Sequence, residues 1–339
     1  METGPRELEA VKPPNPLKGA FHRMAWLKLI RWKNLLIVFG TQLLAWACVL
    51  LPMKQYAQEP LLLGFGNFLC LSLSTVLIAA AGYIINDYFD VKIDIINRPE
   101  KMVLEKRIPR RYGIIAHTVL NVIGLALALY VARQAGHYEW LILQFFCTAL
   151  LWFYSASFKR QFIIGNVVVA LLTALTMLTL IVYEPAMRPY LLERYFLITS
   201  SGWELNPVWV LGVYTFFAFM LTWMREIVKD MEDYKGDAEE GCITMPIKWG
   251  LLRSARFTQV LGLLAITPLI VGSIRLLDAG WMPLGIYMIA AVVLPLAWWI
   301  ITVNNKATTE HYAKASRNLK FIMITGVGSL IIYYIQTNG

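Results

Sequence analysis

Apolar runs of about twenty residues recur along this chain of 339 residues, and they constrain its fold more than any other feature. Each run is long enough to cross a hydrocarbon core of about 30 Å as an α-helix. Inside a membrane every backbone polar group must be bonded within the chain, so such runs form helices. The runs that we predict to span the membrane are 34–52, 66–85, 112–131, 139–157, 163–183, 206–224, 257–277, 282–303 and 320–336. We therefore expect an all-α integral membrane protein with a bundle of about nine transmembrane helices.

The composition agrees with this class. Hydrophobic residues make up 58% of the chain and charged residues 16%, whereas soluble domains carry about 25% charged residues. Residues 1–33 contain prolines and basic groups without an apolar core, so they do not resemble a cleavable signal peptide. We expect 1–33 to be a cytoplasmic N-terminal segment and 34–339 to be one nine-helix domain.

The distribution of basic residues predicts the orientation in the membrane. With the N-terminus in the cytoplasm, the segments on the inside hold 26 Lys and Arg, and those on the outside hold five. Cytoplasmic loops carry such an excess, so we predict a cytoplasmic N-terminus and an outer C-terminus. The net charge of +9 then reflects topology and contact with anionic membrane lipids, and we expect no nucleic-acid partner.

Two aspartate triplets of identical spacing follow the second and the sixth predicted spans. They consist of Asp87, Asp90 and Asp94 and of Asp230, Asp233 and Asp237. Residues spaced by three and then four lie on one face of a helix, so each triplet forms a stripe of carboxylates. Carboxylates at membrane depth normally face a cavity and a partner. Because both triplets fall on the cytoplasmic side, we expect them to face each other.

These oxygen ligands, with the Asn86 amide, suit Mg²⁺ or Ca²⁺ better than zinc or copper. The histidines and cysteines show no metal-binding spacing. Magnesium usually takes one or two carboxylates and completes its shell with substrate phosphates. We interpret the triplets as a site for a metal-bridged diphosphate. Basic side chains near the triplets, each by itself more typical of a cytoplasmic loop than of a substrate ligand, are Arg98, Lys101, Lys106, Arg107, Lys159, Arg160, Arg225 and Lys229.

Three motifs together resemble the UbiA superfamily of intramembrane prenyltransferases. They are NDxxDxxxD from Asn86, YSxxxKR from Tyr154 and a second aspartate motif from Asp230, each after the expected span. The resemblance covers nearly the whole chain. It implies a nine-helix bundle with a cytoplasmic-side active site, in which both aspartate motifs bind Mg²⁺ and the diphosphate of an isoprenyl donor.

The resemblance also implies roles for individual residues. All six aspartates would be metal ligands and catalytic, Lys159 and Arg98 would contact diphosphate, and Tyr154 and Ser155 would line the cavity. Phe and Trp side chains inside the bundle would shield a carbocation. The full set that we predict to bind substrate is Asn86, Arg98, Lys101, Arg107, Tyr154, Ser155, Lys159, Arg225 and Lys229.

Two segments, NDYFDVKIDIINRPEK and REIVKDMEDYKGDAEEGCITMP, are most similar to the branch that makes digeranylgeranylglyceryl phosphate. That similarity implies transfer of a geranylgeranyl chain to geranylgeranylglyceryl phosphate, forming an ether lipid. The chain departs from the usual pattern at RWKN, where Trp32 replaces a common Pro, and at VLEKRI, which replaces PIPSGRI. The second departure changes the loop over the active site, so the acceptor is less constrained than the donor.

Two alternatives are compatible with the sequence. The acceptor can instead be aromatic, of the hydroxybenzoate, dihydroxynaphthoate or homogentisate type used in quinone biosynthesis. The many Lys and Arg in 98–111 favour a phosphorylated acceptor. An ion channel or transporter belongs to another class and predicts ionisable residues near the middle of several spans. Here the charges lie at the ends of the predicted spans.

Overall fold

A computed structural model describes residues 19–54, 60–97, 102–192, 197–199, 202–204, 206–239, 241–304 and 308–338. Within these ranges, nine helical segments are long and apolar enough to cross a membrane. This confirms the bundle of about nine transmembrane helices that the apolar runs predict. The predicted Asp94 lies in a helix, but its side chain is outside the described part, and Arg98 and Lys101 are outside it altogether.

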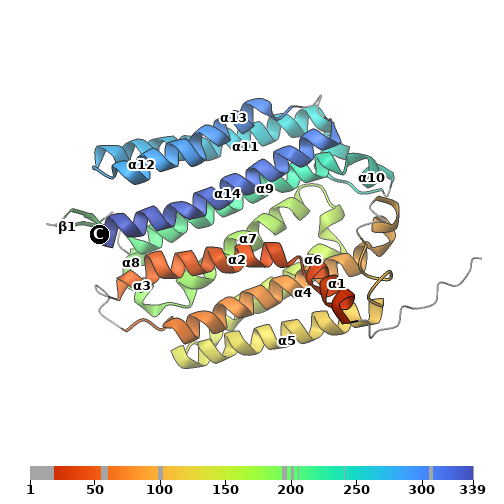
Figure 1. The fold of residues 1–339 in the computed structure, drawn as a ribbon, viewed down its shortest axis with the longest axis horizontal. Helices are drawn as coiled ribbons and strands as arrows, with labels where there is room; N and C mark the ends of the chain where they lie inside the picture. Colours follow the sequence, from red (N-terminus) through yellow and green to blue (C-terminus); the bar gives the residue numbers. More distant parts are fainter. Residues whose placement is uncertain are drawn as a thin grey trace, which may run out of the picture.

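The long helices run in alternating directions through the bundle (Figure 1). The first half contains α1 (Gly19–Leu29), α2 (Trp32–Ala45), α3 (Leu51–Met53), α4 (Phe65–Asn97), α5 (Arg110–Ala135), α6 (Leu141–Ala156) and α7 (Ile164–Val182). The second half contains α8 (Arg188–Leu192), α9 (Pro207–Glu232), α10 (Tyr234–Glu239), α11 (Met245–Asp278), α12 (Met282–Met288), α13 (Leu294–Thr302) and α14 (Thr309–Asn338). A two-stranded antiparallel hairpin, β1 (Leu197–Thr199) and β2 (Gly202–Glu204), is the one addition to the predicted helical fold within the described ranges.

Helices α4 and α9 both end at the side of the bundle that lies on the right in Figure 1, which we call the acidic end. Helix α4 packs along α5 and α6, while α9 packs along α7, α11 and α14. Several helices continue past the predicted span boundaries at this end, since α4 reaches Asn97 and α9 reaches Glu232. Hydropathy marks only the apolar part of a helix, so the polar turns that follow were not included in the predicted spans.

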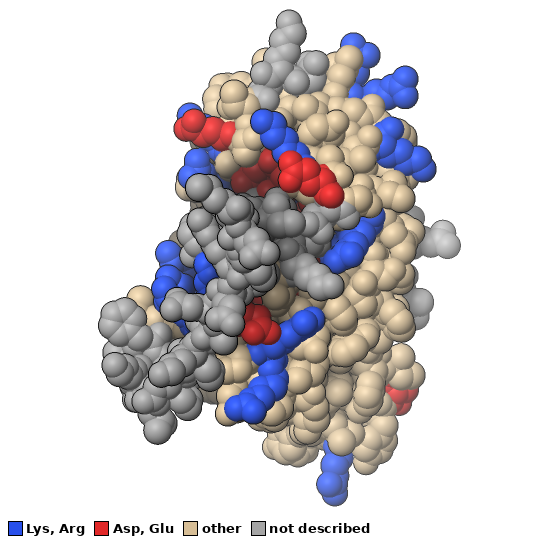
Figure 2. Space-filling view, turned by 90° about the vertical axis from the view of Figure 1, so that its right-hand side faces the viewer, with Lys and Arg blue, Asp and Glu red and all other residues tan. Residues whose placement is uncertain are grey.

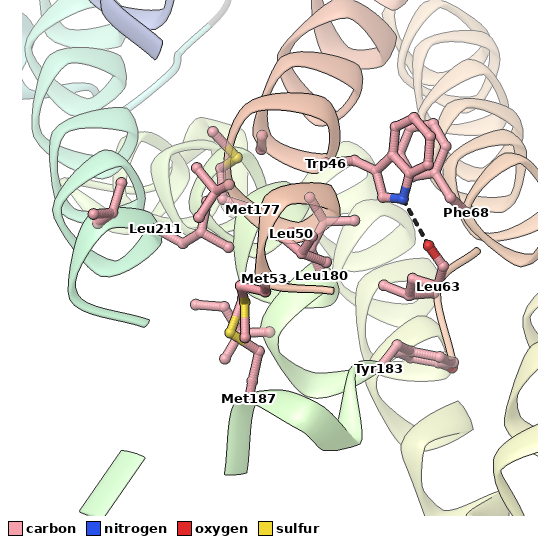
Figure 3. Close-up of a cluster of buried hydrophobic side chains, with 14 of the residues drawn as sticks. Trp46, Leu50, Met53, Leu63, Phe68, Met177, Leu180, Tyr183, Met187 and Leu211 are labelled. Atoms are coloured by element: carbon pink, nitrogen blue, oxygen red, sulfur yellow. Dashed lines mark hydrogen bonds between the residues drawn. The ribbon is translucent and has the colours of Figure 1, made fainter. Parts of the chain in front are cut away.

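A cluster of buried apolar side chains closes the opposite end of the bundle (Figure 3). Trp46 stacks on Phe68 with ring centroids 4.7 Å apart, and its indole N–H donates to the Leu63 carbonyl (2.6 Å). Met177 and Leu180 from α7 pack into the same cluster. These contacts fix α2, α4 and α7 to one another at the end of the bundle that lies away from the acidic end.

A buried carboxylate holds the connections at this closed end. Glu184 is 1% exposed, and its oxygens accept hydrogen bonds from the backbone N–H groups of Leu62 (3.2 Å), Leu63 (2.8 Å) and Ala186 (3.2 Å). Burial raises the pKa of Glu184, while these backbone donors oppose the shift. The side chain therefore ties the segment before α4 to the segment after α7.

We expect Glu184→Ala to lower the free energy of unfolding by roughly 2–4 kcal/mol, because three backbone donors lose their acceptor. Thermal unfolding in detergent measures this change. Asp278→Ala is the control, since Asp278 is exposed at the same end of the bundle, and we expect it to change stability by no more than about 0.5 kcal/mol. Equal melting temperatures for the two variants would contradict the bracing role of Glu184.

Candidate active site

A cavity of about 880 Å³ opens at the acidic end and extends between the helices. Figure 2 views this end directly and shows acidic side chains on the face with basic side chains beside several of them. The charged residues that line the cavity, among those described, are Lys28, Arg31, Asp87, Asp90, Arg107, Lys159, Arg160, Arg225, Glu226, Lys229, Asp230, Asp233, Asp237 and Lys320. Both predicted triplets therefore contribute to one cavity.

The first triplet lies on α4, as its spacing predicts. Asp87 accepts a hydrogen bond from the Arg31 guanidinium at 2.9 Å, which joins the start of α2 to α4. Asp90 accepts from the Asn86 amide (2.9 Å) and forms an ion pair with Lys159. Both carboxylates thus face positive groups from other parts of the chain.

The second triplet does not lie on one continuous helix, so that part of the prediction is wrong. Helix α9 ends at Glu232, Asp233 follows with φ −90° and ψ 6°, and α10 begins at Tyr234. Aspartate and the nearby Gly236 are poor helix formers, which favours a break here. The backbone N–H of Asp237 still donates to the Asp233 carbonyl at 3.0 Å. The two aspartates and Asp230 consequently remain on the wall of the same cavity.

Lys159 reaches the cavity from a tight turn, η4 (Phe158–Arg160), between α6 and α7. Burial lowers the pKa of its ammonium group to about 7, with Arg160 adding to the shift and Asp87 opposing it. The N–H of Ile243 donates to the Arg160 carbonyl at 2.9 Å, which fixes the turn from the other side. A Cβ on Gly165 would lie 2.8 Å from Lys159 Cα, so this turn needs a glycine beneath it.

The other predicted substrate-binding residues divide into two groups. Asn86, Arg107, Tyr154, Arg225 and Lys229 line the cavity with Lys159. Ser155 does not, because it lies about 100° further round α6 from Tyr154, and its hydroxyl donates to the Leu151 carbonyl at 2.8 Å. Its predicted place on the cavity wall is therefore corrected to a buried position within α6.

A sequence model of the UbiA prenyltransferase family matches residues 33–323, which is most of the chain. This chain belongs to that family. It is a membrane prenyltransferase, as the three motifs imply. Two similar curated proteins are each named digeranylgeranylglyceryl phosphate synthase. The one from Pyrococcus abyssi is 30% identical over 75% of this chain and 79% of its own length. The one from Saccharolobus solfataricus is 30% identical over 76% of this chain and 80% of its own length.

Solved structures share the fold of this prenyltransferase. One comes from work on digeranylgeranylglyceryl phosphate synthase in membranes, with a TM-score of 0.60 and 23% identity, covering 93% of this chain and 99% of that one. Another is a UbiA homolog from Archaeoglobus fulgidus bound to GPP and Mg²⁺. Its TM-score is 0.55 at 12% identity, and the match covers 91% of this chain and 99% of that one.

The donor atoms on the cavity wall of the prenyltransferase fit a magnesium ion that also binds substrate. Asp87, Asp90 and Asp230 supply hard carboxylate oxygens, and basic side chains lie among them. Within the described residues, no three acidic, histidine or cysteine side chains are arranged to hold a metal ion by themselves. Magnesium usually takes one or two carboxylates and uses phosphate oxygens and water for the rest. The arrangement therefore fits a metal bound together with a diphosphate.

The deeper part of the cavity is largely apolar and suits a hydrocarbon chain. Ile78, Leu151 and Leu172 line it, and Thr75 and Thr176 lie further in. Tyr83 and Tyr154 are the aromatic residues on the described part of the wall, which includes no Phe or Trp. The expected shielding by Phe and Trp is therefore corrected, because these side chains pack elsewhere and leave two tyrosines beside the charged groups.

Sequence reasoning missed three residues that shape the charged part of the site. Arg31 pairs with Asp87, and the Asn166 amide donates to Asp230 at 2.8 Å. Glu226 is buried and pairs with both Arg225 and Lys229 at 2.8 Å. A signal for Glu226 was present, because a carboxylate one turn before Asp230 lies on the same stretch of helix as the second triplet.

We expect Gly165→Ala to reduce prenyl transfer by at least about tenfold, because the added methyl displaces the turn that carries Lys159. Steady-state kinetics with purified enzyme measures the loss. Gly212→Ala is the matched control, since a Cβ at Gly212 has no neighbour within 4 Å. An unchanged rate in Gly165→Ala would show that the position of the turn does not matter for catalysis.

Proposed function

We propose that this prenyltransferase transfers a geranylgeranyl chain from its diphosphate to geranylgeranylglyceryl phosphate, forming a diether lipid with Mg²⁺ as cofactor. The observation that carries the proposal is a single cavity that joins facing acidic motifs and basic groups to a long apolar channel. The names of the two similar curated proteins support the choice of acceptor. The bound GPP and Mg²⁺ in the Archaeoglobus fulgidus homolog support the donor class and the metal.

The length of the channel supports a donor of several isoprene units. Asp87 and Thr75 both line the cavity and are twelve residues apart on α4, which is about 18 Å along the helix. A donor whose diphosphate lies beside Asp87 therefore has room for a long chain extending toward Thr75. Because Ile78, Leu151 and Leu172 form an apolar wall along this length, burial of the chain stabilises the bound donor.

The charged residues of the cavity provide the chemistry of transfer. Asp87, Asp90, Asp94, Asp230, Asp233 and Asp237 would hold Mg²⁺, which offsets negative charge on the diphosphate when bound. Lys159 and Arg107 donate to the diphosphate as the bond between its oxygen and C1 of the donor breaks. The hydroxyl oxygen of the acceptor then bonds to C1 and releases its proton, so that an ether and free diphosphate are formed.

We also propose that the acidic end faces the cytoplasm, with the N-terminus inside and the C-terminus outside. The charge distribution supports this orientation, because 26 of the 31 Lys and Arg lie in the segments that the sequence predicts to be on the inside. The opposite orientation would place almost all of them outside. Donor and acceptor would then enter from the cytoplasmic leaflet.

A transfer assay in membranes tests the proposed reaction directly. Labelled geranylgeranyl diphosphate is supplied with Mg²⁺, with or without EDTA, and with geranylgeranylglyceryl phosphate or a hydroxybenzoate as acceptor. We expect a diether product that disappears with EDTA. A prenylated aromatic would refute the acceptor and retain the reaction class, and a lack of donor binding would refute the whole proposal.

We expect Asp90→Asn and Asp233→Asn each to reduce turnover by at least about 100-fold, because each removes a charge that would hold the metal. Both changes conserve side-chain size, so circular dichroism and thermal unfolding should match the wild type. Glu310→Gln is the control, since Glu310 is exposed and lies outside the cavity. Near-normal turnover in either aspartate variant would show that its motif is only a charged helix end without a catalytic role.

A further inference from the structure

We propose that Lys320, Arg225 and Asn34 form a second anion site in the cavity, which binds the phosphate of the acceptor. This inference rests on the proposed function and specifies it further, because it names the residues that recognise the phosphorylated acceptor. The site lies where α2, α9 and α14 meet, and helix α14 packs against both of the others. All three residues line the same cavity as the aspartate motifs.

Lys320 is a half-buried cation without an acidic partner among the described residues. Its ammonium group donates to the Asn34 side-chain oxygen at 2.6 Å, which fixes it at the cavity wall. Arg225 and Lys33 are like charges that act on it. A partly buried ammonium in such surroundings is stabilised by an anion. An anionic ligand in the cavity meets that need.

Arg225 also has unused hydrogen-bonding capacity. One of its terminal nitrogens donates to Glu226 at 2.8 Å, but its Nε atom is buried and has no hydrogen-bond partner in the described structure. Buried N–H groups are almost always bonded, so this residue, which lines the cavity, has a hydrogen-bonding group that the described structure does not use. Glu226 also pairs with Lys229, so one carboxylate is shared by two cations. Positive charge is therefore in excess on this wall.

The charge balance of the whole cavity supports two anionic groups rather than one. Eight basic and six acidic side chains line its described part, before any metal ion is bound. Near the diphosphate site, Lys159 and Arg31 already pair with Asp90 and Asp87. Lys320 has no such role there. It comes from a different helix, and its charge is available to a second anion.

The chemistry of the acceptor requires the second site to adjoin the first. Glycerol is a short backbone, so the phosphate of a glyceryl phosphate lies close to its reacting hydroxyl. Arg225 lies five residues before Asp230 on α9, which is about 7.5 Å along the helix. A phosphate held by Arg225 and Lys320 would therefore place the hydroxyl beside the second aspartate motif, close to C1 of a donor whose diphosphate is held between the two motifs.

Kinetics with two acceptors tests this assignment in the purified full-length enzyme. One acceptor is geranylgeranylglyceryl phosphate, and the other is geranylgeranylglycerol, which lacks the phosphate. We expect Lys320→Met to raise KM for the phosphorylated acceptor at least about tenfold, as expected for one charge-assisted hydrogen bond. The kcat/KM for the alcohol and the KM for geranylgeranyl diphosphate should stay within about twofold of wild type. Lys320→Arg should retain most of the preference for the phosphate.

Lys314→Met is the matched control, because Lys314 is exposed on the same helix and lies outside the cavity. It should leave the KM for the phosphorylated acceptor at the wild-type value. A higher KM for the donor in Lys320→Met would assign the lysine to the diphosphate and overturn the proposal. So would an equal loss with both acceptors, which would indicate a structural role. If the wild-type enzyme transferred nothing to the phosphorylated acceptor, the proposed function itself would fail, and this inference with it.

Discussion

Ion pairs and polar hydrogen bonds between residues that are remote in sequence organise the acidic end of this bundle. Asp87 is held by Arg31, Asp90 by Lys159, and Asp230 by Asn166, so each carboxylate joins α4 or α9 to another element. A desolvated carboxylate without a partner costs several kcal/mol, and the helices must converge to supply one. The same convergence creates a charged cavity, because the partners approach from all sides of it.

The closed end of the bundle makes this arrangement possible. The apolar cluster around Trp46 and the bracing contacts of Glu184 fix the helices at the far end of the bundle. Charges at the acidic end therefore do not have to stabilise the fold alone. Some of them can stay partly unmatched, as Lys320 does, and remain available to substrate. The bundle thus has a closed end that stabilises the fold by apolar packing and an acidic end that carries the candidate active site.

The sequence was sufficient to predict the bundle, because an apolar run that crosses a membrane must bond its own backbone groups and therefore forms a helix. It also placed the first aspartate triplet on one helix, and the structure puts Asp87 and Asp90 of that triplet on the cavity wall. The prediction was wrong at Asp233, where one backbone turn ends the helix. It was also wrong at Ser155, where a rotation of about 100° around α6 takes the side chain off the cavity wall. Arg31 and Asp87 are 56 residues apart, and no local pattern indicates that they meet.

The role of Lys320 also depends on contacts that the sequence does not reveal. In the sequence it is one of several basic residues before an apolar run. The orientation of the chain in the membrane accounts for all of them equally well. In the folded chain it lies against Asn34, on a cavity wall shared with Arg225. Basic residues that fix orientation must gather at the acidic end, so they are already close to any anionic substrate that binds there. The same basic residues can therefore set the orientation in the membrane and bind phosphate. Only their contacts in the folded chain show which of them can bind phosphate.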